Sequence, residues 1–294
     1  MKVLLLGSSG QLGSSIIIQR PKEIELFTFN RSELNILNKN DLKEKVREIK
    51  PNWIINSAAY TNVEQAEINR DLALKVNRDG PRNISEVVKE IGGNLLHIST
   101  DFVFDGNSFA PYKPTDQTNP LSYYGTTKLL GENEVLKIRS QKNKIIILRT
   151  SWLMGPFGKN FAKTMLKLHQ ENDLIKVVHD QTGCPTSTIS LANICWAIIN
   201  KNKQDISFDF PEIMHWSDKG QSNWYEVAKE IGEIGIKLNK ISKTARVVPI
   251  KSSEYKTKAV RPLYSILDIK ETERILEINS LNWKESLFKS LKEY

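Results

Sequence analysis

The sequence is poor in cysteine and has no long apolar run. Only Cys184 and Cys195 occur among 294 residues, too few for a disulfide framework or a cysteine-based metal site. The longest apolar stretches, such as residues 3–6 and 145–148, fall far short of the ~20 residues that a membrane-spanning helix needs. No apolar signal region with a cleavage site follows Met1. We therefore expect a cytoplasmic protein with reduced cysteines and no membrane partner.

Clusters that would indicate nucleic-acid or metal binding are missing too. The formal net charge is +8, but the lysines are spread along the chain and form no basic stripe with aromatics, so we expect no nucleic-acid partner. A positive field would still attract a diphosphate ligand. The four histidines lack metal-ligand spacing, and we expect no metal site and no catalytic histidine.

Short apolar runs alternate with longer amphipathic stretches, which is typical of an α/β fold with a doubly wound parallel sheet (Rossmann). The expected strands are residues 3–6, 25–29, 53–56, 94–98 and 144–148. We predict an NAD(P)-binding domain over residues 1–150. Residues 151–294 are predicted to complete the sheet domain and to form a smaller C-terminal substrate-binding lobe, because the βα rhythm is lost there.

The first chemical motif is a glycine turn between the first strand and the first helix. Gly7, Gly10 and Gly13 have the spacing G-x-x-G-x-x-G. Glycines there allow a tight turn, let backbone amides approach a pyrophosphate and let the helix pack on the strand. This pattern predicts that a dinucleotide binds at the turn.

Asn30 and Arg31 follow the second strand, where an acidic residue would select NAD through the adenosine ribose. Asn30 does not repel a 2′-phosphate, and Arg31 could pair with one. The pair favours NADPH over NADH but leaves both cofactors open.

The third motif joins Tyr124 and Lys128 at i and i+4 on one face of a predicted helix. A nearby ammonium would lower the pKa of the phenol toward neutrality, which suits an acid–base group. Thr100 and Asp101 follow the fourth strand, so that the Thr100 hydroxyl could donate a hydrogen bond to the same reacting carbonyl.

Together these motifs resemble the extended short-chain dehydrogenase/reductase superfamily. Longer runs resemble the dTDP-4-dehydrorhamnose reductase family over nearly the whole chain. They are NSAAYT at 56–61, STDFVFDG at 99–106, RTSW at 149–152, DQTGCPT at 180–186, SNWYE at 222–226 and RPLYS at 261–265.

The resemblance implies reduction of the 4-keto group of dTDP-4-dehydro-β-L-rhamnose to dTDP-L-rhamnose, and allows a homodimer. Hydride would come from the nicotinamide, the proton from Tyr124, and Lys128 would orient the ribose. The remaining implied roles are cofactor binding by Gly10, Gln11, Leu12, Ala59, Tyr60, Thr61 and Ile98, and sugar contact by Thr100, Asp101 and Trp152.

Departures from the family pattern keep alternatives open. Phe102 stands where the family commonly has tyrosine, and Asn30 and Asn35 where it commonly has aspartate. Asp101-Phe102 argues against a 4,6-dehydratase, because dehydratase chemistry resembles one that uses an acidic Asp-Glu pair directly after the threonine to eliminate water. A reductase of another keto-deoxysugar nucleotide and a non-catalytic subunit resembling the methionine adenosyltransferase β subunit stay open. Arg261 is either a turn residue or a diphosphate contact.

Overall fold

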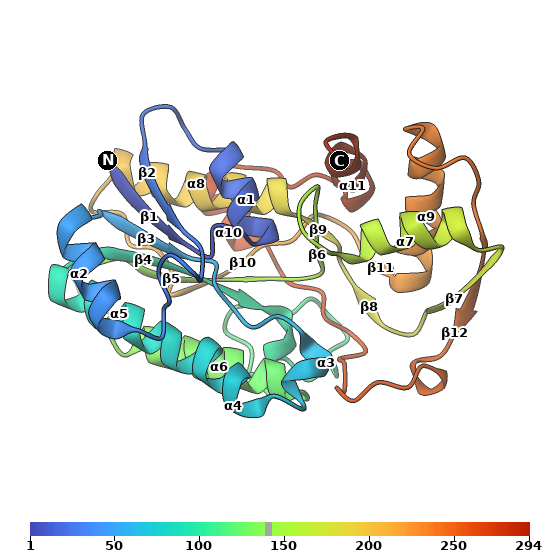
Figure 1. The fold of residues 1–294 in the computed structure, drawn as a ribbon, viewed down its shortest axis with the longest axis horizontal. Coiled ribbons are helices and arrows are strands. Elements are labelled where there is room, and N and C mark those ends of the chain that lie inside the picture. The colour runs from blue at the N-terminus through green and yellow to red at the C-terminus, as the bar shows by residue number, and fades with distance from the viewer. Residues whose placement is uncertain (139–142) are drawn as a thin grey trace.

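The computed structural model describes residues 1–138 and 143–294, and a parallel six-stranded sheet forms the centre of that part of the chain (Figure 1). The strand order is β10-β5-β4-β3-β1-β2. The strands are β1 (Lys2–Leu6), β2 (Glu25–Phe29), β3 (Trp53–Asn56), β4 (Asn94–Thr100), β5 (Ile145–Thr150) and β10 (Ile213–His215).

Helices cover both faces of the sheet. On one face lie α1 (Gln11–Ile18), α8 (Thr188–Gln204) and α10 (Lys270–Leu276), and on the other lie α2 (Lys39–Ile49), α5 (Gly80–Ile91) and α6 (Tyr123–Leu136) (Figure 1). Two short helices, α3 (Val63–Ala66) and α4 (Arg70–Leu74), and a π-helical turn at Lys75–Asp79 lead from β3 into α5.

The continuous apolar runs of the central strands arise because both faces are buried. Along β1, Val3 and Leu5 pack into the cluster under α1 and α8, while Leu4 and Leu6 pack into the cluster under α2 and α5. All four are fully buried. Alternate side chains of β1 thus serve opposite layers, and both layers are apolar at this strand.

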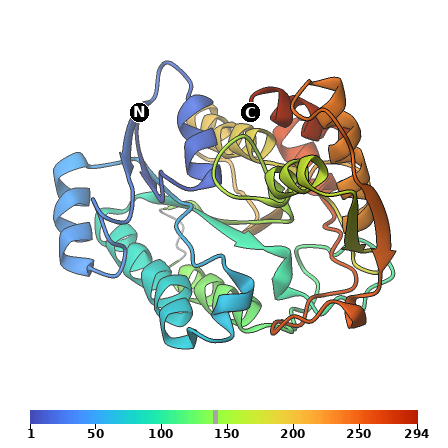
Figure 2. The same ribbon diagram turned by 45° about the vertical axis from the view of Figure 1, so that its right-hand side comes forward.

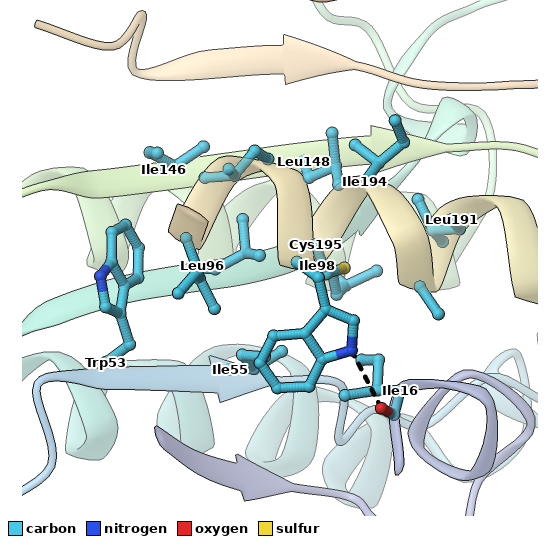
Figure 3. Packing of buried hydrophobic residues seen from close by; sticks show 14 of the residues in the cluster. Ile16, Trp53, Ile55, Leu96, Ile98, Ile146, Leu148, Leu191, Ile194 and Cys195 are labelled. Carbon is cyan, nitrogen blue, oxygen red and sulfur yellow. Dashed lines mark hydrogen bonds between the residues drawn. The ribbon is translucent and has the colours of Figure 1, made fainter. Parts of the chain in front are cut away.

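The layer under α8 is the larger core cluster. Leu191, Ile194 and Cys195 of α8 face Ile98 and Leu148 of the sheet (Figure 3). Both cysteines are free and buried, as predicted.

The sheet order places a switch point beside β1. From β1 the chain crosses to β2 on one side, and β3 then pairs with β1 on the other side. In doubly wound sheets ligands bind at the carboxyl ends of the strands flanking such a point. The segments that begin at Gly7 and Ser57 lie there.

A smaller lobe lies beyond the carboxyl ends of β4 and β5 (Figure 2). Its core cluster joins α7 (Phe161–Glu171), α9 (Trp224–Lys237) and α11 (Trp283–Lys292) to the parallel pair β7 (Leu174–Val178) and β12 (Arg246–Ile250). Its short strands are β6 (Leu153–Met154), β8 (Thr182–Gly183), β9 (Thr186–Ser187) and β11 (Ser222–Asn223).

The predicted α/β fold with a doubly wound parallel sheet is confirmed, and all five predicted strands are present with ends shifted by at most two residues. The sixth strand, β10, escaped prediction because only three residues pair with β5. In the described part of the chain, no helix is both long and apolar enough to cross a bilayer.

Candidate active site

The turn after β1 is built from glycines that its packing requires. Gly7 has a φ of +83°, and a Cβ there would lie 2.6 Å from the backbone nitrogen of Ala58. At Gly13 a Cβ would lie 2.8 Å from the backbone of the turn itself. Gly10 caps α1 without a side-chain hydrogen bond. The first turn of α1 can therefore present backbone amides to an anionic ligand.

A cavity of about 490 Å³ connects this turn with the end of β4 and the start of α6. We call it the reaction cavity. Predicted site residues that line it are Gly10, Gln11, Leu12, Gly13, Ala59, Thr61, Ile98, Thr100, Asp101, Tyr124, Lys128 and Trp152. A second cavity, of about 210 Å³, shares Gly10 and Ala59 with it and is also lined by Gly7, Arg31 and Tyr60.

Asn30 is the predicted cofactor residue that the structure places outside both linings. Its side-chain oxygen accepts hydrogen bonds from the backbone nitrogen of Ser32 at 2.9 Å and from that of Glu33 at 3.2 Å. An asparagine at the end of a strand satisfies its own turn in this way. Arg31, the next residue, is exposed and faces the second cavity.

Thr100 and Asp101 lie buried where β4 ends. The Thr100 hydroxyl donates to Asp101 Oδ1 at 2.9 Å and accepts from the backbone nitrogen of Phe102 at 3.2 Å. Burial raises the pKa of Asp101 to about 6, and the hydrogen bond from Thr100 opposes this rise. The two bonds fix the threonine hydroxyl at the cavity wall.

Tyr124 and Lys128 enter the same cavity from the first turns of α6. The helix begins there because the Ser122 side chain accepts from the backbone nitrogen of Gly125 at 3.1 Å. The Tyr124 ring meets Phe102 edge to face, with ring centres 5.5 Å apart. Both Tyr124 and Lys128 are more than nine-tenths buried.

The acid–base properties of the pair differ from the sequence-based expectation. Burial raises the pKa of Tyr124 well above its ordinary value, although a hydrogen bond with Thr100 works against this. Lys128 Nζ donates to the Ile98 carbonyl at 2.7 Å. Burial lowers the pKa of Lys128 to about 8. Desolvation thus outweighs the lowering that we expected from the ammonium, and the phenol is held protonated at neutral pH.

Trp152 lines the reaction cavity in a strained conformation. Its φ is +43°, in the left-handed region that non-glycine residues rarely occupy. Its ring stacks on Trp224 with centres 3.7 Å apart. At Gly183, a Cβ would lie 2.8 Å from the indole nitrogen of Trp152. Packing on both sides therefore holds the tryptophan in this conformation.

Sequence reasoning missed several residues that line the reaction cavity. Trp224, to which the sequence analysis gave no role of its own, lies at the first position of α9 and stacks on Trp152. Arg261, which the sequence analysis left as either a turn residue or a diphosphate contact, also lines the cavity and pairs with Glu64 at 3.0 Å. Ser151 and Lys159 also line it. A tryptophan directly after the helix-capping Asn223 was the available signal for Trp224.

A third cavity, of about 500 Å³, lies between α7 and β7 in the lobe. We call it the lobe cavity. It shares Trp224 and Arg261 with the reaction cavity, and its lining is mostly apolar, with Met165, Leu168 and Val177 among the residues. The reaction cavity and the lobe cavity thus meet at the Trp224 ring and the Arg261 guanidinium. Over residues 1–138 and 143–294, no cluster of three or more His, Cys, Asp or Glu could hold a metal.

A parallel sheet with a glycine turn at its switch point, and a threonine, a tyrosine and a lysine facing one cavity, define a short-chain dehydrogenase/reductase. Fold and site together indicate a dinucleotide-dependent oxidoreductase rather than a binding module.

Comparison with known proteins narrows this class. The family model described as "RmlD substrate binding domain" matches residues 1–294. A dTDP-4-dehydrorhamnose reductase of Aggregatibacter actinomycetemcomitans is 35% identical over 100% of this chain and 99% of its own length. The chain therefore belongs to the dTDP-4-dehydrorhamnose reductase family, a family of NAD(P)H-dependent oxidoreductases.

Solved structures agree with this assignment. The crystal structure of a dTDP-4-dehydrorhamnose reductase from Clostridium acetobutylicum is 38% identical, with a TM-score of 0.88 over 99% of this chain and 98% of that one. The enzyme from Bacillus anthracis, solved in complex with NADP, is 34% identical, with a TM-score of 0.89 over 100% and 99%. The family predicted from the motifs is confirmed.

Proposed function

We propose that this chain reduces the 4-keto group of dTDP-4-dehydro-β-L-rhamnose to dTDP-L-rhamnose, using NADPH or NADH. The observation that carries the proposal is that Thr100, Tyr124 and Lys128 line one cavity together with the glycine turn. A dinucleotide fits this turn because Gly7 and Gly13 let it close where side chains would collide with backbone, and because even at Gly10 a Cβ would lie 3.3 Å from the Gly7 carbonyl oxygen. When bound, the cofactor supplies the hydride to the sugar C4.

The cofactor would be held by residues of both adjoining cavities. Gly10, Gln11, Leu12 and Gly13 would contact its phosphates through the start of α1. The adenosine and ribose would lie along Gly7, Arg31, Ala59, Tyr60, Thr61 and Ile98, and the nicotinamide ribose near Lys128.

The chain's own groups provide the proton and polarise the carbonyl. With substrate bound, the Thr100 hydroxyl would turn its hydrogen from Asp101 Oδ1 to the carbonyl oxygen, and Tyr124 would transfer its phenolic proton to that oxygen as negative charge develops. The raised pKa of Tyr124 keeps the proton available at neutral pH until the oxyanion forms. Lys128 would then stabilise the phenolate through its ammonium.

The sugar nucleotide would extend from the reaction cavity into the lobe cavity. The sugar would contact Asp101 and Trp152, and the diphosphate would pair with Arg261 between the two spaces. The apolar lobe cavity would take the base. On this proposal residues 1–150 bind the dinucleotide, while residues 151–294 complete the sheet domain and supply the substrate-binding lobe.

Replacing Tyr124 tests the proton donor. Tyr124→Phe removes the proton and keeps the ring, so turnover of dTDP-4-dehydrorhamnose should fall by about 10²–10⁴-fold. Binding of NADPH, measured by fluorescence titration, should be retained. The matched control is Tyr123→Phe on the same helix, which should keep turnover. Unchanged turnover in Tyr124→Phe would exclude this tyrosine as the donor.

A substrate panel separates the proposed function from its alternatives. The purified protein is given dTDP-4-dehydrorhamnose and other 4-keto sugar nucleotides, and loss of NADPH or NADH is followed by absorbance. Preference for another keto sugar would revise the substrate, and no oxidation of either cofactor would favour a regulatory subunit. The homodimer and the cytoplasmic location remain predictions, to be tested by light scattering and cell fractionation.

A further inference from the structure

A buried polar cluster lies directly beneath the catalytic pair, between α6 and the sheet. It consists of Ser99 on β4, Glu132 on α6 and Arg149 on β5, and each is at most 3% exposed. The Ser99 hydroxyl donates to Glu132 Oε1. Ser99 and Arg149 belong to the runs at 99–106 and 149–152, but the sequence analysis assigned no chemical role to any of the three.

Arg149 binds the Glu132 carboxylate with two parallel hydrogen bonds. Its Nε donates to Oε1 at 3.0 Å and its Nη2 donates to Oε2 at 2.7 Å. The guanidinium also lies over the Phe104 ring, 5.2 Å from its centre. A bidentate pair of this kind fixes orientation as well as charge.

Two members of the cluster are close neighbours of the groups that face the cavity, one along β4 and the other along α6. Ser99 precedes Thr100, and Glu132 lies four residues after Lys128, hence one turn along the same face of α6. Arg149 is the register partner of Ser99, as Thr150 is of Thr100. Any movement of α6 against β4 would change this cluster and the catalytic geometry together.

We propose that Glu132 and Arg149 are positioning residues for the catalytic pair. Arg149 binds the Glu132 carboxylate, so that this carboxylate compensates the charge of the Lys128 ammonium only in part. The hydrogen bonds of Glu132 with Ser99 and Arg149 also hold α6 in place against β4 and β5. This inference rests on the proposed function, because it assigns Lys128 an acid–base role.

The charges around Lys128 agree with this arrangement. On α6, Glu132 raises the pKa of Lys128 but does not overcome burial, which lowers it to about 8. On β4, burial and the Lys128 charge lower the pKa of His97, which therefore stays neutral. Tyr124 and Asp101 face the cavity side, and Arg149 is the cation on β5. The Glu132 carboxylate, which Arg149 engages through two hydrogen bonds, thus offsets only part of the effect of burial on Lys128.

Titration of the Lys128 side chain by NMR tests the proposal directly. Protein with isotope-labelled lysine is titrated, and the Lys128 signal is assigned by its loss in Lys128→Arg. In Glu132→Gln the midpoint should fall by about one unit, since the compensating negative charge is gone. In Arg149→Met it should rise, because the carboxylate then turns to the ammonium.

Matched variants separate charge from packing. Ser99→Ala removes a hydrogen bond to the same carboxylate without changing charge, and Arg149→Lys keeps the cation, so both should titrate within a few tenths of a unit of the parent. If Arg149→Met does not fold, the Lys128 midpoints of Glu132→Gln and of these two controls still test the proposal. A midpoint in Glu132→Gln equal to that of the parent, or equal shifts in all variants, would overturn the proposal.

The enzymatic pH profile then distinguishes this inference from the proposed function. If both hold, the limb of kcat/KM that reports Lys128 moves in the same direction as the NMR midpoint. Shifted midpoints in a protein that reduces no keto-sugar nucleotide would refute the proposed function alone. Unshifted midpoints in an active enzyme would refute the inference alone.

Discussion

Two carboxylate–guanidinium pairs flank the reaction cavity and differ mainly in depth. Arg149 and Glu132, on the sheet side, have side chains that are 2% and 1% exposed. Arg261 and Glu64, on the lobe side, are 28% and 34% exposed. A fully buried pair cannot separate without leaving a bare charge, whereas a half-exposed pair can exchange its partner for water or for a ligand. The difference in burial thus agrees with the positioning role that we propose for the first pair and with the binding role that we propose for the second.

The largest expected effect is on the buried pair. Arg149→Met removes both guanidinium hydrogen bonds from the buried Glu132 carboxylate, which should lower the free energy of unfolding by about 3–5 kcal/mol. Arg261→Gln, at the exposed pair, should change it by less than about 1 kcal/mol. Urea unfolding followed by circular dichroism measures both.

The double variant Glu132→Gln/Arg149→Met serves as the control for this prediction. It removes both charges, so much of the stability lost in Arg149→Met should return. Equal destabilisation by Arg149→Met and Arg261→Gln would show that depth does not distinguish the two pairs.

The same contrast explains what the sequence could and could not predict. Gly7 directly follows β1, Thr100 ends β4 and Tyr124 lies in the first turn of α6, so local patterns drew attention to them. Trp224 and Arg261 come from distant segments, and only the packing of the lobe brings them to the cavity. The predicted contact of Asn30 with the cofactor stays a prediction, and its side-chain oxygen accepts hydrogen bonds within its own turn. Spacing along the chain does not record such competition between local hydrogen bonds and a ligand.

The next effect concerns substrate binding at the half-exposed pair. If Arg261 leaves Glu64 for a substrate diphosphate, Arg261→Gln should raise the KM for the sugar nucleotide by about 10–100-fold and leave kcat nearly unchanged. This range corresponds to the loss of a charged hydrogen bond of about 1.5–3 kcal/mol. Steady-state kinetics measure the split. Arg246→Gln, an exposed arginine of the same lobe, is the control, and an unchanged KM in Arg261→Gln would make the Glu64 pair purely structural.

Arg31 extends the comparison to a fully exposed cation and should give the smallest effect. It lines the second cavity at the predicted adenosine end, where a 2′-phosphate would distinguish NADPH from NADH. An exposed ion pair contributes up to about 1 kcal/mol, so Arg31→Ala should reduce the preference for NADPH, as a ratio of kcat/KM values, by about twofold to fivefold. Salt screens exposed charges, and the difference from the parent should therefore vanish at high ionic strength. The exposed Arg20, outside both cavity linings, gives the control variant Arg20→Ala. A preference that drops equally in both variants would reflect the general positive field of the protein, while a drop confined to Arg31→Ala assigns the phosphate contact to this residue.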